Sequence, residues 1–398
     1  MSENTKLEKS ENHKSRLSKT IQSIPPSGIR RYFDLASSME DVISLGVGEP
    51  DFVTAWNVRE ASIYSMERGF TTYTSNSGLP ELRKEIARYL VEQFQVEYDP
   101  AKEVVVTVGA SEAIDIALRA ILDPGDEVLV VEPCYVSYDP VIRLAGGVPV
   151  PIHTSQSNQF KVTAEAITEK ITEKTKAIIF CFPNNPTGST MNRADLEKIA
   201  KVLIEHDLIV ISDEIYAELT YDYKHVSIAE LPQMQERTIL ISGFSKAFAM
   251  TGWRIGYACG PQDIIQAMIK IHQYTMLCAP IMGQKAALEA LKNGMNEKDK
   301  MVESYKQRRN YVVKAFQDIG LECHQPEGAF YAFPSVKNTG FSSEEFTERL
   351  IVEEKVAVVP GSVFGESGIG YIRCSYATSL DSLKRAIERM GNFLQRHK

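Results

Sequence analysis

The stretch Thr238-Ile-Leu-Ile-Ser-Gly-Phe-Ser-Lys246 joins a continuous apolar run to a short turn that ends in lysine. Residues 238–242 show no alternation of polar and apolar side chains, which is typical of a strand buried on both faces of a parallel sheet. Open α/β sheets bind their ligands beyond the carboxyl ends of such strands. A lysine after a strand is most often a solvated surface residue, but this position also suits an amine that bonds to a ligand.

Similar runs recur through the middle of the chain, with helical patterns between them. Strands are predicted at residues 104–108, 128–131, 177–182 and 208–212, and helices at residues 111–122 and 194–206. Alternation of strands and helices predicts the α/β class, with a mostly parallel sheet between helices.

The two ends of the chain show a different pattern. Residues 44–51 form a glycine-rich turn region, and the last part of the chain predicts strands at 328–333, 356–359 and 370–376 and helices at 342–354 and 380–396. We therefore expect a large domain of residues 56–294 and a smaller α+β domain of residues 19–55 with 295–398. Residues 1–18 are polar without an apolar core, which predicts a disordered tail and no secretory signal.

Composition excludes several classes of function. The net charge is −8 and no basic block occurs, so a nucleic-acid partner is not expected. No apolar run approaches the ~20 residues that a membrane-spanning helix needs. The six cysteines are far apart without C-x-x-C, which indicates a reduced, cytoplasmic protein, and the seven histidines show no spacing typical of a metal site.

Polar side chains follow three neighbouring predicted strands. Asn185 lies in the turn after residues 177–182, and Asp213 and Tyr216 follow residues 208–212. Alone, Asn185 reads as a turn residue, Asp213 as a helix cap and Tyr216 as a core tyrosine. Together with Lys246, they provide an amine for an aldehyde, a carboxylate for a pyridine nitrogen and donors for a phenolate oxygen.

Phosphate and carboxylate groups also have candidate partners. The segment Gly109-Ala-Ser111 opens a predicted helix, whose free N–H groups suit a phosphate, and Arg254 supplies a cation. Tyr135 follows the strand at 128–131 and fits either ring stacking or plain packing. Arg373 lies within an apolar strand and needs an anion, which is either a structural carboxylate or the α-carboxylate of a substrate. This set of groups is what pyridoxal phosphate (PLP) and an amino acid require.

The order of these motifs resembles the class I aminotransferases of PLP fold type I, from about Ser27 to the C-terminus. The subgroup holds bacterial and archaeal aromatic, alanine, aspartate and N-acetyl-diaminopimelate aminotransferases. The resemblance rests on the motifs Gly46-Val-Gly-Glu-Pro-Asp51, Tyr73, Gly109-Ala-Ser111, Pro133-Cys-Tyr135, Asn185-Pro-Thr-Gly188, Asp213-Glu-Ile-Tyr216, Ser245-Lys246, Gly252-Trp-Arg-Ile-Gly256 and Arg373.

The resemblance implies a role for each of these positions. Lys246 would be the lysine that binds the cofactor and catalyses proton transfer, with Asp213 at the ring nitrogen and Asn185 and Tyr216 at the ring oxygen. Tyr135 would stack on the ring. The phosphate would contact Ala110, Ser111 and Arg254, joined by Tyr73 from the second subunit of a homodimer, and Ser245 would also bind the cofactor. Gly48, Asn185 and Arg373 would bind the substrate.

The implied reaction moves the amino group of an L-amino acid to a 2-oxo acid, with 2-oxoglutarate as the expected acceptor. Aspartate-specific members of the subgroup carry a lysine where this chain has Ser111, so an aromatic or broad range of donors is expected. The alternatives are an N-acetyl-diaminopimelate, aspartate or alanine aminotransferase, or a PLP carbon–sulfur β-lyase. A PLP-sensing transcriptional regulator is not expected, because the residues before Ser27 do not predict a DNA-binding domain.

Overall fold

A computed structural model of the chain describes residues 16–37 and 39–397. Residues 1–15 lie outside this range, so the disorder expected for them stays a prediction. At the other end of the expected tail, Ser18 caps the short helix α2 (Lys19–Ser23), because its side chain accepts a hydrogen bond from the backbone N–H of Ile21.

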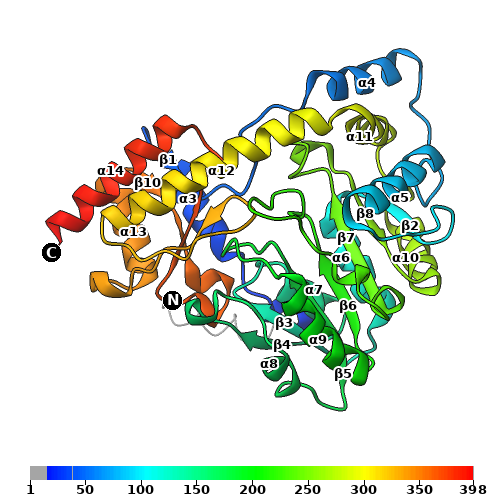
Figure 1. Cartoon of the computed structure of the whole chain (residues 1–398), viewed down its shortest axis with the longest axis horizontal. Helices are drawn as coiled ribbons and strands as arrows, with labels where there is room; N and C mark the ends of the chain where they lie inside the picture. Colours follow the sequence, from blue (N-terminus) through cyan, green and yellow to red (C-terminus); the bar gives the residue numbers. More distant parts are fainter. Residues whose placement is uncertain (1–15, 38, 398) are drawn as a thin grey trace, which may run out of the picture.

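A seven-stranded sheet forms the centre of the molecule (Figure 1). Its order is β2-β8-β7-β6-β5-β3-β4, and all neighbours pair in parallel except that β8 runs antiparallel to β2 and β7. The bounds are β2 (Val104–Thr107), β3 (Glu127–Glu132), β4 (Val148–His153), β5 (Thr175–Cys181), β6 (Ile209–Asp213), β7 (Thr238–Gly243) and β8 (Gly256–Cys259). The α/β class and the mostly parallel sheet are therefore confirmed.

Successive side chains of the central strands enter different hydrophobic cores. On β7, Ile239 and Ile241 belong to one buried cluster, whereas Leu240 belongs to another. On β5, Ile178 and Ile179 are likewise divided between two clusters. Because strand side chains alternate between the two faces of a sheet, this division shows that helices cover both faces and explains the continuous apolar runs.

The helices that surround the sheet, directly or through a neighbouring helix, come from the same part of the chain (Figure 1). They are α4 (Trp56–Glu67), α5 (Pro80–Phe94), α6 (Gly109–Ile121), α7 (Tyr138–Leu144), α8 (Ala164–Thr168), α9 (Arg193–Glu205), α10 (Gln262–Thr275) and α11 (Ile281–Asn293). Helix α6 packs on α10, and α11 packs on α4 and α5. No helix in the described part of the chain is long and apolar enough to cross a membrane.

The two ends of the chain meet in a separate group of short strands. Strand β1 (Ile43–Ser44) pairs in parallel with β10 (Val356–Ala357), and a three-stranded sheet has the order β11-β12-β9. The other bounds are β9 (Tyr331–Ala332), β11 (Val359–Pro360), β12 (Ile372–Ser375), α3 (Gly28–Ser37), α12 (Met295–Asp318), α13 (Ser343–Glu354) and α14 (Leu380–Arg396). We propose that residues 19–55 with 295–398 form the smaller domain.

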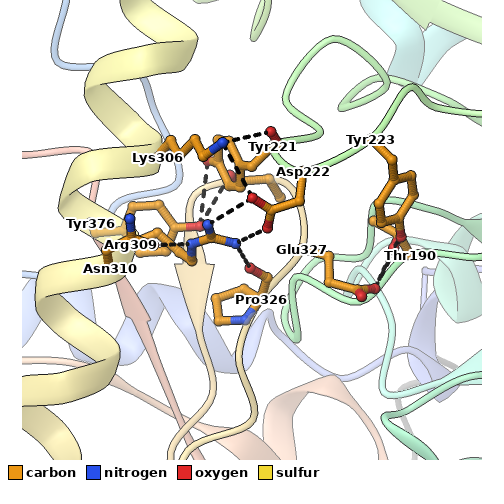
Figure 2. A network of polar contacts seen from close by, with 11 residues as sticks. Thr190, Tyr221, Asp222, Tyr223, Lys306, Arg309, Asn310, Pro326, Glu327 and Tyr376 are labelled. Atoms are coloured by element: carbon orange, nitrogen blue, oxygen red, sulfur yellow. Dashed lines mark hydrogen bonds and ion pairs between the residues drawn. The ribbon is translucent and has the colours of Figure 1, made fainter.

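A polar network joins α12 to the loops beside the large sheet (Figure 2). Arg309 of α12 is buried, and its Nη1 donates to Asp222 Oδ2 at 2.8 Å and to the carbonyl oxygen of Pro326 at 3.0 Å. Lys306 donates to the carbonyl oxygen of Tyr221 at 3.2 Å. A buried guanidinium with these partners fixes the position of α12 against the loop that follows β6.

Candidate active site

A cavity of about 690 Å³ opens where the carboxyl ends of β3, β5, β6 and β7 meet the N-terminus of α6. Every site residue expected from the sequence lines it except Tyr73. The lining residues from that set are Gly48, Ala110, Ser111, Tyr135, Asn185, Asp213, Tyr216, Ser245, Lys246, Arg254 and Arg373. Tyr73 is 80% exposed and lies outside the lining of this chain's own cavity.

Lys246 extends from the end of β7 into this cavity. Its Nζ donates a hydrogen bond to the carbonyl oxygen of Gly48 at 2.5 Å. Burial, reinforced by the positive charges of Arg373 and Arg254, lowers the pKa of Lys246 to about 8, although Glu49 and Asp213 oppose the shift. A minority of this amine is therefore neutral near physiological pH, far more than of an ordinary lysine, and the neutral form is the one that nucleophilic attack or proton abstraction requires.

Asp213 is the last residue of β6, and its carboxylate is buried. Tyr138 donates from its hydroxyl to Asp213 Oδ2 at 2.6 Å, and the backbone N–H of Ile215 donates to Oδ1 at 3.2 Å. Burial raises the pKa of Asp213 to about 6 in spite of these bonds. A cation in the cavity would therefore stabilise the ionised carboxylate, because opposite charges favour each other strongly in a buried site.

Tyr138 is a functional candidate that the sequence did not single out. It stands on the first turn of α7, with its ring edge-on to Tyr135 at 5.7 Å between centroids. In the sequence, Tyr138 is marked merely by its position three residues after Tyr135. The fold shows that its hydroxyl reaches Asp213 at the end of β6.

Arg373 lies on β12, buried among aromatic rings. Its guanidinium donates to Asn185 Oδ1 at 2.8 Å and to the carbonyl oxygen of Gly46 at 2.7 Å. Tyr331 and Phe364 lie against it, with ring centroids 4.6 and 4.9 Å from the guanidinium carbon. The Nε–H is buried with no hydrogen-bond partner among the described residues. No carboxylate of the described chain neutralises Arg373, which makes it a receptor for an anion from outside.

The hydroxyl of Tyr216 forms a hydrogen bond with that of Tyr331, a second residue that the sequence did not single out. The hydroxyls of Tyr216 and Tyr331 are 2.9 Å apart, and both side chains are buried. Tyr331 also blocks any side chain at Gly48, since a Cβ there would lie 2.5 Å from its hydroxyl. Glycine at position 48 therefore allows its backbone to approach both Tyr331 and Lys246.

The start of α6 forms a corner with space for a phosphate. Gly109 has φ +77°, and a Cβ on it would lie 2.4 Å from Arg254 Nη2. A Cβ on Gly256 would lie 2.4 Å from the backbone nitrogen of Ala110. The first turn of α6 therefore carries helix N–H groups without intrahelical partners beside a guanidinium, as phosphate binding requires.

Glu112 and His272 form a buried pair next to this corner. Glu112 accepts the backbone N–H of Val108 at 2.5 Å and lies 2.6 Å from Nδ1 of His272 on α10. His272 has no exposed surface. The pair holds the turn between β2 and α6 in place. No group of His, Cys, Asp or Glu in the described residues could hold a metal ion.

Comparison with known proteins agrees with this geometry. Residues 40–390 match the family model for aminotransferases of class I and II. The chain belongs to this aminotransferase family. It is therefore a transaminase with the α/β architecture of PLP fold type I.

Relatives of this chain within the family differ in the substrates that their names record. YugH of Bacillus subtilis, named as an aminotransferase, is 61% identical over 96% of this chain and 99% of its own length. The aspartate aminotransferase of Pyrococcus abyssi is 47% identical over 96% of this chain and 99% of its own. The aromatic aminotransferase of Pyrococcus horikoshii, a solved structure, is 44% identical with a TM-score of 0.88 over 92% of this chain and 99% of its own.

Proposed function

We propose that this aminotransferase uses PLP to move the amino group of an L-amino acid, from an aromatic or broad range of donors, to a 2-oxo acid such as 2-oxoglutarate. One observation carries the proposal. A partly buried lysine with a pKa of about 8, a buried carboxylate and a buried, uncompensated arginine line one cavity at the carboxyl ends of parallel strands.

The lining residues fit PLP group by group. Lys246 would bind the aldehyde carbon, and Asp213 would pair with the ring nitrogen. Asn185 and Tyr216 would contact the ring oxygen, with Tyr135 beside the ring. The phosphate would occupy the corner formed by Ala110, Ser111, Ser245 and Arg254. When bound, PLP would stabilise negative charge at the substrate Cα, which an amino acid alone cannot do.

The protein's own groups would orient the substrate and move its proton. Arg373 and Asn185 would hold the α-carboxylate, and the backbone at Gly48 would lie behind the substrate. Lys246 Nζ would take the proton from Cα as a general base and return it as a general acid, for which a pKa near the working pH is best.

A donor screen tests the proposed function. Purified enzyme is incubated with PLP and each of phenylalanine, tyrosine, alanine, aspartate and a thioether amino acid, with and without added 2-oxoglutarate. We expect the donor's oxo acid to accumulate only when the acceptor is present. A carbon–sulfur β-lyase would instead release pyruvate and a thiol from a thioether amino acid without any acceptor, and that result would overturn the proposal.

We expect Arg373→Lys to weaken every substrate by a similar factor, because all of them carry the α-carboxylate. Lysine keeps the charge but loses the two parallel donors of the guanidinium. Loss of a charge-assisted hydrogen bond predicts a fall in kcat/KM of about 10- to 100-fold for each amino and oxo acid. Steady-state kinetics across acidic, aromatic and small donors measures it.

The exposed arginine Arg385 of α14 provides the control for Arg373, and Arg385→Lys should leave all donors unchanged. A loss with Arg373→Lys that is confined to one class of side chain would contradict the assignment of Arg373 to the α-carboxylate.

We also propose that the enzyme is a homodimer in which Tyr73 reaches the phosphate corner of the second subunit. Trp56, Tyr64, Tyr73 and Tyr274 are all more than half exposed. Large exposed side chains on α4, on the loop after it and at the end of α10 favour a protein interface. Sedimentation equilibrium that gives the mass of one chain would contradict the homodimer.

A further inference from the structure

We propose that Arg309 of α12 is a positioning residue for the cofactor ring, because it anchors the segment 326–331, which holds Asn185 and Tyr216 in the cavity. The inference rests on the function proposed above and adds a residue that touches neither cofactor nor substrate. Arg309 does not line the cavity. Its side chain is only 2% exposed, and an arginine is almost never buried so fully unless its charge is paired.

Arg309 joins the loop after β6 to the segment 326–331 (Figure 2). Its Nη1 donates to Asp222 Oδ2 at 2.8 Å and to the carbonyl oxygen of Pro326 at 3.0 Å. The ring of Tyr221 covers the guanidinium, with its centroid 5.2 Å from the guanidinium carbon. The hydrogen bond from Arg309 lowers the pKa of Asp222, so this pair stays charged at physiological pH.

The segment 326–331 supports the turn that carries Asn185. The backbone N–H groups of Glu327 and Gly328 both donate to the carbonyl oxygen of Gly188 at 2.9 Å. A Cβ on Gly188 would lie 2.3 Å from Pro326 Cβ, so the turn and the segment are in direct contact. Since Pro326 is also the residue that Arg309 binds, a shift of this contact would move the turn.

The same segment sets the pair of tyrosine hydroxyls in the cavity. The N–H of Ala329 donates to the carbonyl oxygen of Leu219 at 2.8 Å, and the N–H of Leu219 donates to the carbonyl oxygen of Tyr216 at 2.8 Å. Tyr331 ends the segment, and its hydroxyl lies 2.9 Å from that of Tyr216. The position of the segment therefore determines the position of both hydroxyls.

A looser segment should change bound PLP in one direction. Asn185 and Tyr216 would donate to the ring oxygen, which carries negative charge close to the nitrogen of Lys246 that bonds to PLP. Donors that share this charge weaken its attraction for a proton on the nitrogen. Poorer placement of the donors therefore raises the pKa of the nitrogen, and the visible absorption of the PLP-loaded enzyme reports this pKa.

The test compares Arg309→Lys with a second buried cation of α12. Lysine keeps the charge but loses the planar fork that reaches two acceptors. We expect the pH at which the visible absorption changes to rise by about 0.5 to 1 pH unit, as for weakening of one hydrogen bond. Lys298→Gln is the control, because Lys298 pairs with Glu218 and Asp299 rather than with the segment 326–331. It should lower the melting temperature without moving the absorption change.

Asp222→Asn provides a second variant that removes the charged partner and leaves Arg309 in place. Asp222 is 41% exposed, so this variant should fold even if Arg309→Lys does not. It should move the absorption change in the same direction. No shift in the variants that fold, or an equal shift in Lys298→Gln, would overturn the assignment of Arg309.

A double-mutant cycle separates positioning from a general loss of stability. If Arg309 acts through Tyr216, Arg309→Lys, or Asp222→Asn in its place, should have no more than about half its effect in a Tyr216→Phe background. Fully additive shifts would contradict the inference while leaving the proposed function intact. A wild-type enzyme that gains no visible absorption with PLP would overturn the proposed function, and this inference with it.

Discussion

Replacing Lys246 with alanine is expected to lower kcat by at least about 10⁴-fold, because one side chain both bonds to the cofactor and carries the proton at Cα. The variant should keep its fold, since Lys246 makes a single hydrogen bond, to the Gly48 carbonyl. Steady-state transamination with added acceptor measures the loss. Lys201→Ala on the exposed face of α9 is the matched control and should behave as wild type.

A second measurement on the same lysine does not depend on turnover. In the cofactor-free protein, the pKa of Lys246 is lowered to about 8, so its amine is mostly protonated below pH 8 and mostly neutral above it. Labelling of Lys246 by an amine-reactive reagent should therefore rise steeply through pH 8. Borohydride treatment of the PLP-loaded enzyme should attach the cofactor to Lys246, and attachment at another lysine would contradict the assignment.

Asp213→Asn is expected to lower kcat by about 10²- to 10³-fold, comparable with the loss of one preorganised electrostatic contact in other enzymes. An amide cannot balance a proton on the ring nitrogen of PLP, and that proton makes the ring withdraw electrons from the substrate. The side chain is nearly isosteric, so Tyr138 and the Ile215 N–H keep a partner on residue 213. Single-turnover kinetics with a saturating donor isolates the chemical step.

The control for this substitution is Asp263→Asn on the exposed start of α10, which should leave kcat unchanged. Equal melting temperatures would show that the loss in Asp213→Asn comes from chemistry rather than unfolding. A kcat for Asp213→Asn within a few-fold of wild type would remove Asp213 from the ring-nitrogen position.

The central strands could be predicted from the sequence because burial on both faces leaves a simple signature. The runs at 177–182, 208–212 and 238–242 correspond to β5, β6 and β7 within two residues at each end. Strand β4 was not predicted, because Pro149 and Pro151 interrupt its pattern. The structure places β4 at the edge of the sheet, where proline is tolerated. The strand expected at 328–333 is reduced to β9, since only Tyr331 and Ala332 pair with β12.

The candidate site was predictable where a polar residue directly follows a parallel strand. The carboxyl ends of β5, β6 and β7 share one edge of the sheet, so Asn185, Asp213 and Lys246 come together for topological reasons. Tyr138 and Tyr331 could not be found in this way. Their contacts with the cavity depend on a helix start and on a short strand in a distant part of the chain, neither of which has a local sequence pattern.

The placement of β1 has a consequence for the order in which the enzyme is completed during synthesis. The backbone N–H of Leu45 donates to the carbonyl oxygen of Ala357, and its carbonyl oxygen accepts the N–H of Ser375. Arg373 reaches the Gly46 carbonyl across 327 positions of the chain. Nascent chains leave the ribosome N-terminus first, so residues 43–48 are made early and wait for their partners until almost the whole chain has emerged. A chain that stops before β12 carries Lys246, Asp213 and every strand of the large sheet, yet it lacks Arg373 and the hydrogen bond from Ser375 that help to fix the Gly46–Gly48 backbone.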